Sequence, residues 1–186
     1  MRILLCAAVL ALSGCGQNAD SASDASACAR SATHEVVWSG TTADTITARS
    51  EGQSCAQAVV TFVARDADGD PLWTFASTYY DMTMGGIPPE GAPEVSVGQM
   101  DEFLAGWVNV TTMRSGELPA WREDAATLTE SATTFAYDTP FDRETYEALR
   151  ARNLAMICYA AAVEASQCLI VDPASHAPTL MVAYGP

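Results

Sequence analysis

Residues 58–80 read AVVTFVARDADGDPLWTFASTYY, and this stretch decides the fold class. Apolar and polar residues alternate over 58–65 and again over 72–80, which is the two-residue period of a half-buried strand. The pair Asp68-Gly69 lies between the two runs, and Asp-Gly between alternating runs is the strongest short-range signal for a β-hairpin. The sequence therefore predicts two antiparallel strands joined by a tight turn.

Further strands are expected on both sides of this hairpin. Two short ones precede it and four follow it, at residues 35–39, 44–50, 133–137, 154–163, 167–171 and 179–184. The run Ala160–Ala162 leaves an alternative open, because alanine favours helices and no glycine or proline lies between Arg152 and Val171. Residues 154–171 could then continue a preceding helix instead of forming strands.

Two helices are expected between the strands. Ser96 and Gln99 have the spacing of a capping box and precede an apolar repeat of helical period. A second helix is expected from Thr139-Pro140, with proline at its first position, to about Arg152. The intervening glycine- and proline-rich residues 81–95 are expected to form a loop. These elements predict an α+β fold: an antiparallel, strongly curved sheet of about six or seven strands, packed by two helices.

The first fifteen residues, MRILLCAAVLALSGC, form a pattern of their own. Arg2 precedes an apolar run of ten residues, which is about 15 Å of helix and too short to span a bilayer. Leu12-Ser13-Gly14-Cys15 follows, an aliphatic residue and two small residues before a cysteine. This pattern resembles the lipobox of bacterial lipoproteins, and no family is recognised in residues 34–186.

The resemblance implies a division of the chain into three parts. Residues 1–14 would be a cleaved signal peptide, and residues 15–33 a lipidated cysteine followed by a flexible tether of small polar residues. Residues 34–186 would form one globular domain. The resemblance further implies that fatty acyl chains on Cys15 (palmitate, for example) hold the protein in the bilayer. Gly16, in place of the aspartate that retains lipoproteins in the inner membrane, favours the outer membrane, facing the periplasm.

The charge balance restricts the partners of this protein. The chain has 9 basic and 23 acidic residues and a net charge of −14, so it lacks the cationic stripe that nucleic-acid binding requires. Such a surface could instead steer a basic protein toward it. Composition thus leaves open an inhibitor of a basic enzyme that attacks the envelope, such as lysozyme. It is equally compatible with a charge that serves solubility alone.

Four cysteines remain if Cys6 is removed with the signal peptide and Cys15 is lipidated. In an oxidising periplasm an even number indicates disulfides, here among Cys28, Cys55, Cys158 and Cys168. We favour Cys158–Cys168, because a hairpin is expected between them, which leaves Cys28–Cys55. Free thiols and zinc binding stay open as alternatives, although neither a C-x-x-C nor an H-x-x-x-H pair occurs.

The remaining candidates for chemistry are sparse. Asp66, Asp68 and Asp70 have a spacing that suits calcium, but the hairpin turn accounts for them and the other ligands of an EF-hand loop are missing. Met82 and Met84 could offer thioethers to Cu(I), with Met113 or His176 completing a site, but they also suit loop anchors. We therefore expect no metal and no cofactor.

Two histidines could act as a general base, His34 and His176, but no nucleophile motif accompanies either one. The function expected from the sequence is a lipid-anchored, non-enzymatic binding or envelope-interaction module. A hydrolase that uses His176 with a nearby acid such as Asp172 is the alternative from another class.

Overall fold

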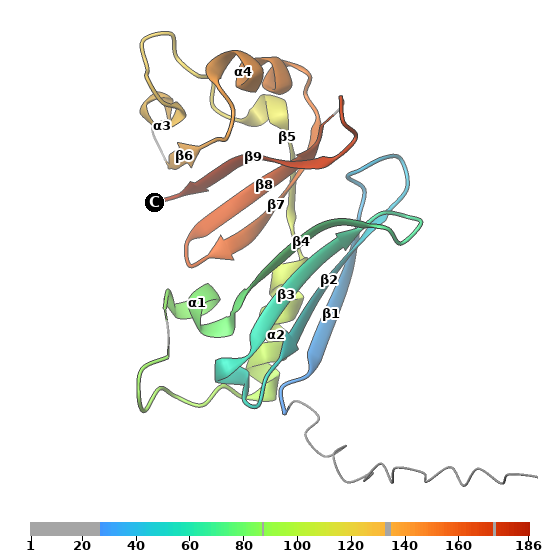
Figure 1. The fold of residues 1–186 in the computed structure, drawn as a ribbon, viewed down its shortest axis with the longest axis vertical. Helices are drawn as coiled ribbons and strands as arrows, with labels where there is room; N and C mark the ends of the chain where they lie inside the picture. The colour runs from blue at the N-terminus through green and yellow to red at the C-terminus, as the bar shows by residue number, and fades with distance from the viewer. Residues whose placement is uncertain (1–26, 87, 133–134, 173) are drawn as a thin grey trace, which may run out of the picture.

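The computed structural model describes residues 27–86, 88–132, 135–172 and 174–186 (Figure 1). It confirms an α+β fold with antiparallel sheets. The expected number of strands and of sheets is wrong, because the described residues form nine strands in two sheets. Cys15 and residues 1–14, the expected signal peptide, lie outside the described residues.

The first sheet is a meander in which each strand pairs with the next one along the chain. Its order is β1 (Arg30–Val36), β2 (Asp44–Glu51), β3 (Val59–Arg65) and β4 (Pro71–Thr78). The second sheet has the order β5-β7-β8-β9-β6. Its strands are β5 (Thr111–Arg114), β6 (Ala136–Asp138), β7 (Ala155–Ala162), β8 (Ala165–Val171) and β9 (Pro178–Gly185). The strands expected over 154–171 are confirmed, so the helical alternative for this segment is wrong.

The β3–β4 turn is the expected hairpin turn. Gly69 has a φ of 88°, a left-handed conformation that favours glycine. The Oδ1 atom of Asp66 accepts hydrogen bonds from the backbone N–H groups of Asp68, at 3.0 Å, and Asp70, at 2.8 Å. The Asp66 carboxylate therefore closes the turn through the backbone of the other two aspartates, which is the turn role that the sequence favoured.

The helices are α1 (Tyr79–Met84), α2 (Val97–Val108), α3 (Leu128–Ser131) and α4 (Arg143–Ala151). Helix α1 covers the last two residues of the strand expected over 72–80 and the first four residues of the loop expected over 81–95. Helix α4 begins three residues later than expected: Asp142, not Thr139, is its N-cap, so Pro140 is not its first helical residue. The carboxylate of Asp142 accepts a hydrogen bond from the N–H of Thr145 at 2.8 Å, which lowers the pKa of Asp142.

The capping box of α2 is confirmed. Ser96 Oγ accepts a hydrogen bond from Gln99 N at 3.2 Å, and Gln99 Oε1 accepts one from Ser96 N at 2.9 Å. We expect Ser96→Ala to lower the free energy of unfolding by about 1 kcal/mol, because an N–H group of the first turn loses its acceptor. Urea denaturation measures this loss. Ser54→Ala is the matched control, since Ser54 precedes the 3-10 turn η2 (Cys55–Gln57) without capping it through its side chain; equal losses would contradict the prediction.

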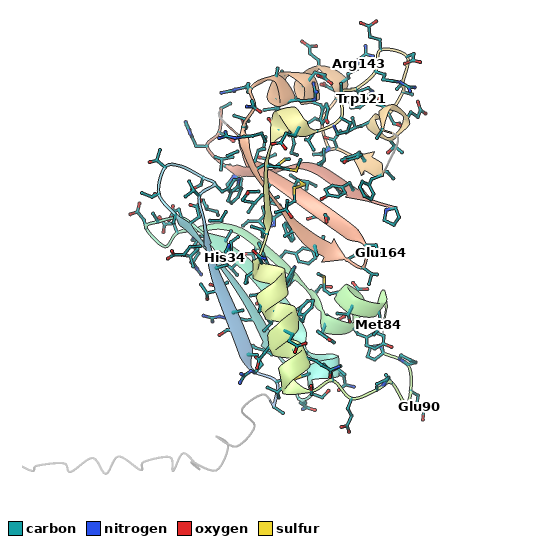
Figure 2. All side chains as sticks on the ribbon, turned by 180° about the vertical axis from the view of Figure 1, so that it is seen from behind. His34, Met84, Glu90, Trp121, Arg143 and Glu164 are labelled. Carbon is teal, nitrogen blue, oxygen red and sulfur yellow. A yellow bond between two sulfur atoms is a disulfide. The ribbon has the colours of Figure 1, made fainter. Side chains whose placement is uncertain are left out.

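The larger core lies between the two sheets. It is built from the inner face of β1–β4, from α2, which lies across that face (Figure 2), and from β7 and β8 of the second sheet. Phe62 on β3 stacks on Tyr159 of β7 with ring centroids 4.7 Å apart. The indole Nε1 of Trp73 donates to the hydroxyl of Tyr159 at 2.9 Å, and that hydroxyl lies 2.6 Å from Gln167 Oε1. Burial raises the pKa of Tyr159 to about 12.

The smaller core lies on the opposite face of the second sheet, under α4, α3 and the 3-10 turn η3 (Ser115–Glu117). Tyr146 of α4 is fully buried there, and its hydroxyl donates to the carbonyl oxygen of Pro119 at 2.7 Å. Burial raises the pKa of Tyr146 well above its ordinary value. The second sheet is therefore covered on both faces over part of its length.

Two disulfides join the described cysteines in the pairing favoured from the sequence. Cys28–Cys55 links the start of the described chain to η2, and Cys158–Cys168 joins directly opposed residues of β7 and β8. Strand β1 begins at Arg30, so residues 30–33, which the sequence assigned to the tether, belong to the first sheet. The guanidinium of Arg30 binds both carboxylate oxygens of Asp101 on α2, at 2.7 and 2.8 Å.

No helix within the described residues has the length and apolar character needed to cross a membrane.

Candidate functional site

Neither of the two histidines considered as a general base belongs to a catalytic arrangement within the described part of the chain. His34 lies exposed on β1, where it pairs with Ile46 of β2. His176 is exposed in the β8–β9 loop, and its backbone N–H donates to the carbonyl oxygen of Asp172. The carboxylate of Asp172 instead accepts from Ser175 Oγ and Ala174 N, both at 2.9 Å, and these contacts lower its pKa.

The structure thus brings Asp172 and Ser175 together as a loop-closing contact and leaves the His176 imidazole without a hydrogen bond among the described residues. The three side chains do not form a nucleophile–base pair. The methionines are also separated. Met82 is buried in the larger core and Met84 is exposed, whereas Met113 packs against the smaller core. Within the described residues, no cluster of three His, Cys, Asp or Glu side chains could hold a metal ion.

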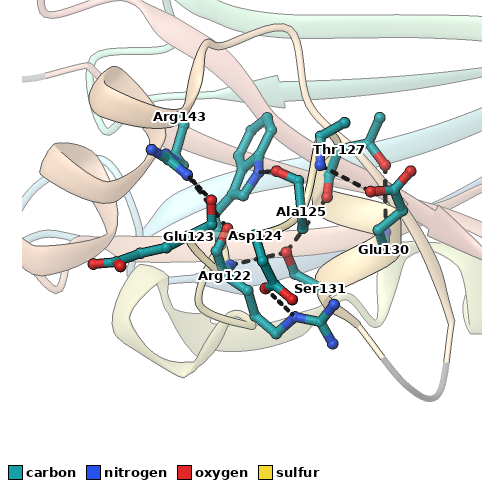
Figure 3. A network of polar contacts seen from close by, with 10 residues as sticks. Arg122, Glu123, Asp124, Ala125, Thr127, Glu130, Ser131 and Arg143 are labelled. Carbon is teal, nitrogen blue, oxygen red and sulfur yellow. Dashed lines mark hydrogen bonds and ion pairs between the residues drawn. The ribbon is translucent and has the colours of Figure 1, made fainter.

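Polar contacts in the segment between η3 and β6 fix a loop over the smaller core (Figure 3). Arg143 of α4 donates to the carbonyl oxygen of Glu123 at 2.9 Å, and Ser131 Oγ accepts from Arg122 N at 2.9 Å. Glu130 accepts from Ala126 N at 2.8 Å. Because Ser131 and Glu130 bind backbone groups of their own loop and Arg143 binds the loop from α4, these side chains stabilise the shape of the loop.

A different feature stands out on the second sheet, at the end that α4 leaves uncovered. Strand pairing places Ala160 of β7 opposite Ser166 of β8, Ser166 opposite Tyr184 of β9, and Tyr184 opposite Tyr137 of β6. Directly opposed residues of an antiparallel sheet place their side chains on the same face. This cross-strand row therefore changes from two small residues to two aromatic ones, which produces a depression beside an aromatic wall.

The depression is a cavity of about 450 Å³, which we call the aromatic hollow. Its lining includes Phe135, Ala160, Ala162, Glu164, Ser166 and Tyr184. A second cavity of about 230 Å³ shares Ala160, Ser166 and Tyr184 with it and extends toward Asn109. The two cavities therefore adjoin each other at Ala160, Ser166 and Tyr184, and the volume of the aromatic hollow lies within the range of small-molecule binding sites.

The rings of Phe135 and Tyr184 line the aromatic hollow, and the ring of Tyr137, which is not part of the lining, contacts both of them. The centroid of Tyr184 lies 5.3 Å from that of Tyr137 and 5.7 Å from that of Phe135. Desolvation, together with the neighbouring Tyr184, raises the pKa of Tyr137. Phe135 nevertheless keeps 43% of its surface exposed. Large exposed aromatic side chains in a cluster are typical of binding surfaces.

Further apolar side chains lie exposed around the β7–β8 turn, next to the aromatic hollow. Val163 in this turn is 39% exposed, and Met84 at the end of α1 is 70% exposed. Gly85, which follows α1, lies close to Val163: a Cβ atom added to Gly85 would be 3.9 Å from Val163 Cγ2. The end of α1 therefore adjoins the β7–β8 turn. Figure 2 shows Met84 and Glu164 on the same side of the molecule. Of the exposed large apolar side chains among the described residues, Phe135 lines the aromatic hollow, and Val163 is adjacent in sequence to Glu164, which also lines it.

A larger groove of about 690 Å³ lies between residues 53–57 and 88–95. It is lined by prolines, alanines and valines together with Glu90 and Glu94, and no aromatic ring lines it. The aromatic hollow is smaller, but its lining combines aromatic rings, small residues and one acidic residue. This combination can select among ligands by shape and by charge, so we take the aromatic hollow as the candidate site. Sequence reasoning missed it, although Phe135 and Tyr137 show the alternation of a strand face.

Comparison of the chain with protein-family models, with curated proteins and with solved structures finds no match in any of the three.

Proposed function

We propose that this protein is a lipid-anchored lipoprotein of the bacterial envelope whose folded domain is a non-enzymatic binding module. The aromatic hollow supports the second part of this proposal: two contacting rings, those of Phe135 and Tyr184, line a cavity of about 450 Å³, and Phe135 is 43% exposed. Contact between aromatic rings and water is unfavourable. A binding partner that covers the rings therefore gains free energy by removing them from water. The lipobox at Leu12–Cys15 supports the first part.

Anchoring and binding are compatible in the geometry of the described chain. The first described residue, Ala27, lies twelve residues after Cys15, so an extended tether would reach about 40 Å at most. The first sheet begins at Arg30. The Cys28–Cys55 disulfide joins the chain just before this sheet to η2, and the Arg30–Asp101 ion pair joins β1 to α2. A lipid on Cys15 would therefore hold the domain near the bilayer while leaving the aromatic hollow, on the second sheet, accessible.

We expect that metabolic labelling with a fatty-acid analogue marks the wild-type protein and that Cys15→Ala abolishes the label, because the thioether forms on this sulfur. Cys6→Ala is the matched control and should keep the label. Cell fractionation should place the wild type with the envelope membranes and release the Cys15→Ala variant. An unlabelled wild-type protein, or equal labelling of Cys15→Ala, would contradict the anchoring.

The binding module is tested separately, by crosslinking purified protein to an extract of envelope components. We expect that one defined adduct forms with the wild type and is lost when Phe135→Ala removes the exposed ring. Val37→Ala is the control, because Val37 is 58% exposed and lies outside the aromatic hollow. Adducts that Phe135→Ala leaves unchanged would contradict a role of the aromatic hollow in binding.

A further inference from the structure

The aromatic hollow has a charge as well as a shape. Glu164, in the β7–β8 turn, lines the cavity together with the rings of Phe135 and Tyr184. Among the described residues that line the hollow and its neighbouring cavity, none is basic. The lining therefore offers a carboxylate and the electron-rich faces of aromatic rings, and it holds no cation of its own.

Aromatic faces and a carboxylate attract the same kind of group. A cation over the face of a tyrosine or phenylalanine ring is drawn to the ring quadrupole, and a nearby carboxylate adds charge attraction. The two rings that line the hollow, those of Phe135 and Tyr184, have centroids 5.7 Å apart and planes 47° apart. A guanidinium or ammonium group in the hollow would therefore lie beside two adjacent rings.

We propose that the aromatic hollow binds an arginine or lysine side chain of a basic polypeptide. The inference rests on the proposed binding function and names the class of its ligand. Charge complementarity selects this occupant, because the chain has a net charge of −14 and the charged residue that lines the hollow, Glu164, is acidic. The small residues Ala160 and Ser166 leave room beside the rings for the aliphatic part of the side chain.

The probe is a fluorescently labelled peptide of alternating glycine and arginine, compared with the same peptide carrying citrulline, which keeps the shape of arginine without its charge. Binding is measured by fluorescence anisotropy at 50 and 300 mM salt. We expect that the arginine peptide binds about five- to thirty-fold more tightly than the citrulline peptide. We also expect that its affinity falls at the higher salt concentration.

Matched variants separate the aromatic hollow from general surface charge. Phe135→Leu keeps an apolar side chain but removes the ring, and Glu164→Gln removes the carboxylate; both should weaken binding of the arginine peptide several-fold. Glu102→Gln, on the exposed face of α2, changes the net charge equally and should leave the affinity within two-fold. Thermal unfolding of each variant shows that the fold is kept.

Three outcomes would overturn the inference. Equal weakening by Glu164→Gln and Glu102→Gln would assign the binding to diffuse surface charge. Equal affinity for the citrulline peptide, or selective binding of a neutral oligosaccharide at Phe135, would assign the hollow to an uncharged ligand. If the arginine peptide does not bind at all, the aromatic hollow has no affinity for a cationic side chain and the inference is wrong. In each case the Phe135-dependent envelope adduct is measured independently and still decides whether the domain is a binding module.

Discussion

Replacing Phe62 with alanine is expected to lower the free energy of unfolding by about 3 to 5 kcal/mol, the range for a buried phenylalanine truncated in a packed core. Phe62 is fully buried, and its ring lies 4.7 Å from that of Tyr159 and 5.6 Å from that of Trp107. The three rings come from the first sheet, the second sheet and α2. The cavity left by Phe62→Ala would therefore open where all three layers meet.

Urea denaturation followed by tryptophan fluorescence measures this effect. Phe135→Ala is the matched control, because it makes the same chemical change at a ring that is 43% exposed, and we expect it to cost less than about 1 kcal/mol. A comparable loss in both variants would contradict the central position of Phe62. The pair also separates the two roles: Phe62→Ala should weaken the fold, and Phe135→Ala should weaken binding.

Removing the Cys28–Cys55 disulfide is expected to cost about 3.5 kcal/mol by the loop-entropy relation, because the bond closes a loop with a sequence separation of 27. The crosslink restricts the unfolded chain and also fixes the start of β1. The double variant Cys28→Ala, Cys55→Ala tests this value in the same denaturation experiment.

The double variant Cys158→Ala, Cys168→Ala is the comparison. Its bond closes a separation of only 10 within a hairpin, so the same relation gives about 2.7 kcal/mol. A smaller loss for Cys28–Cys55 than for Cys158–Cys168 would contradict the loop-length argument. Peptide mass spectrometry after thiol blocking checks the pairing itself, and blocked thiols at these four residues in the native protein would contradict both bonds.

Local signals predicted several elements because their causes are local. The β3–β4 hairpin follows from alternation around Asp68-Gly69, and the start of α2 follows from Ser96 and Gln99, which bind each other's backbone N–H groups. The start of α4 was misplaced because two signals compete there. Proline at position 140 favours a first helical turn, but the Asp142 side chain caps the N–H of Thr145 and sets the start.

Local signals of this kind could not predict the aromatic hollow. Tyr137 and Tyr184 are 47 positions apart, and only the pairing of β6 with β9 places them side by side. β6 is three residues long and lies at the edge of the second sheet, so its alternation alone carries too little information to choose a partner. The exposure of Phe135 likewise depends on where α4 and α3 stop covering the sheet.

The sequence by itself determined the class of the fold, the β3–β4 hairpin and the capped start of α2, and it favoured the disulfide pairing in which Cys158 and Cys168 face each other across a hairpin. Each depends on residues close together in the chain or on a two-residue alternation. The tertiary structure decided that the strands divide into two sheets, that Phe62, Trp107 and Tyr159 meet between them, and that one end of the second sheet stays uncovered. These outcomes depend on packing between distant segments, because burial is decided by which surfaces meet and a sequence pattern shows only which surfaces need covering.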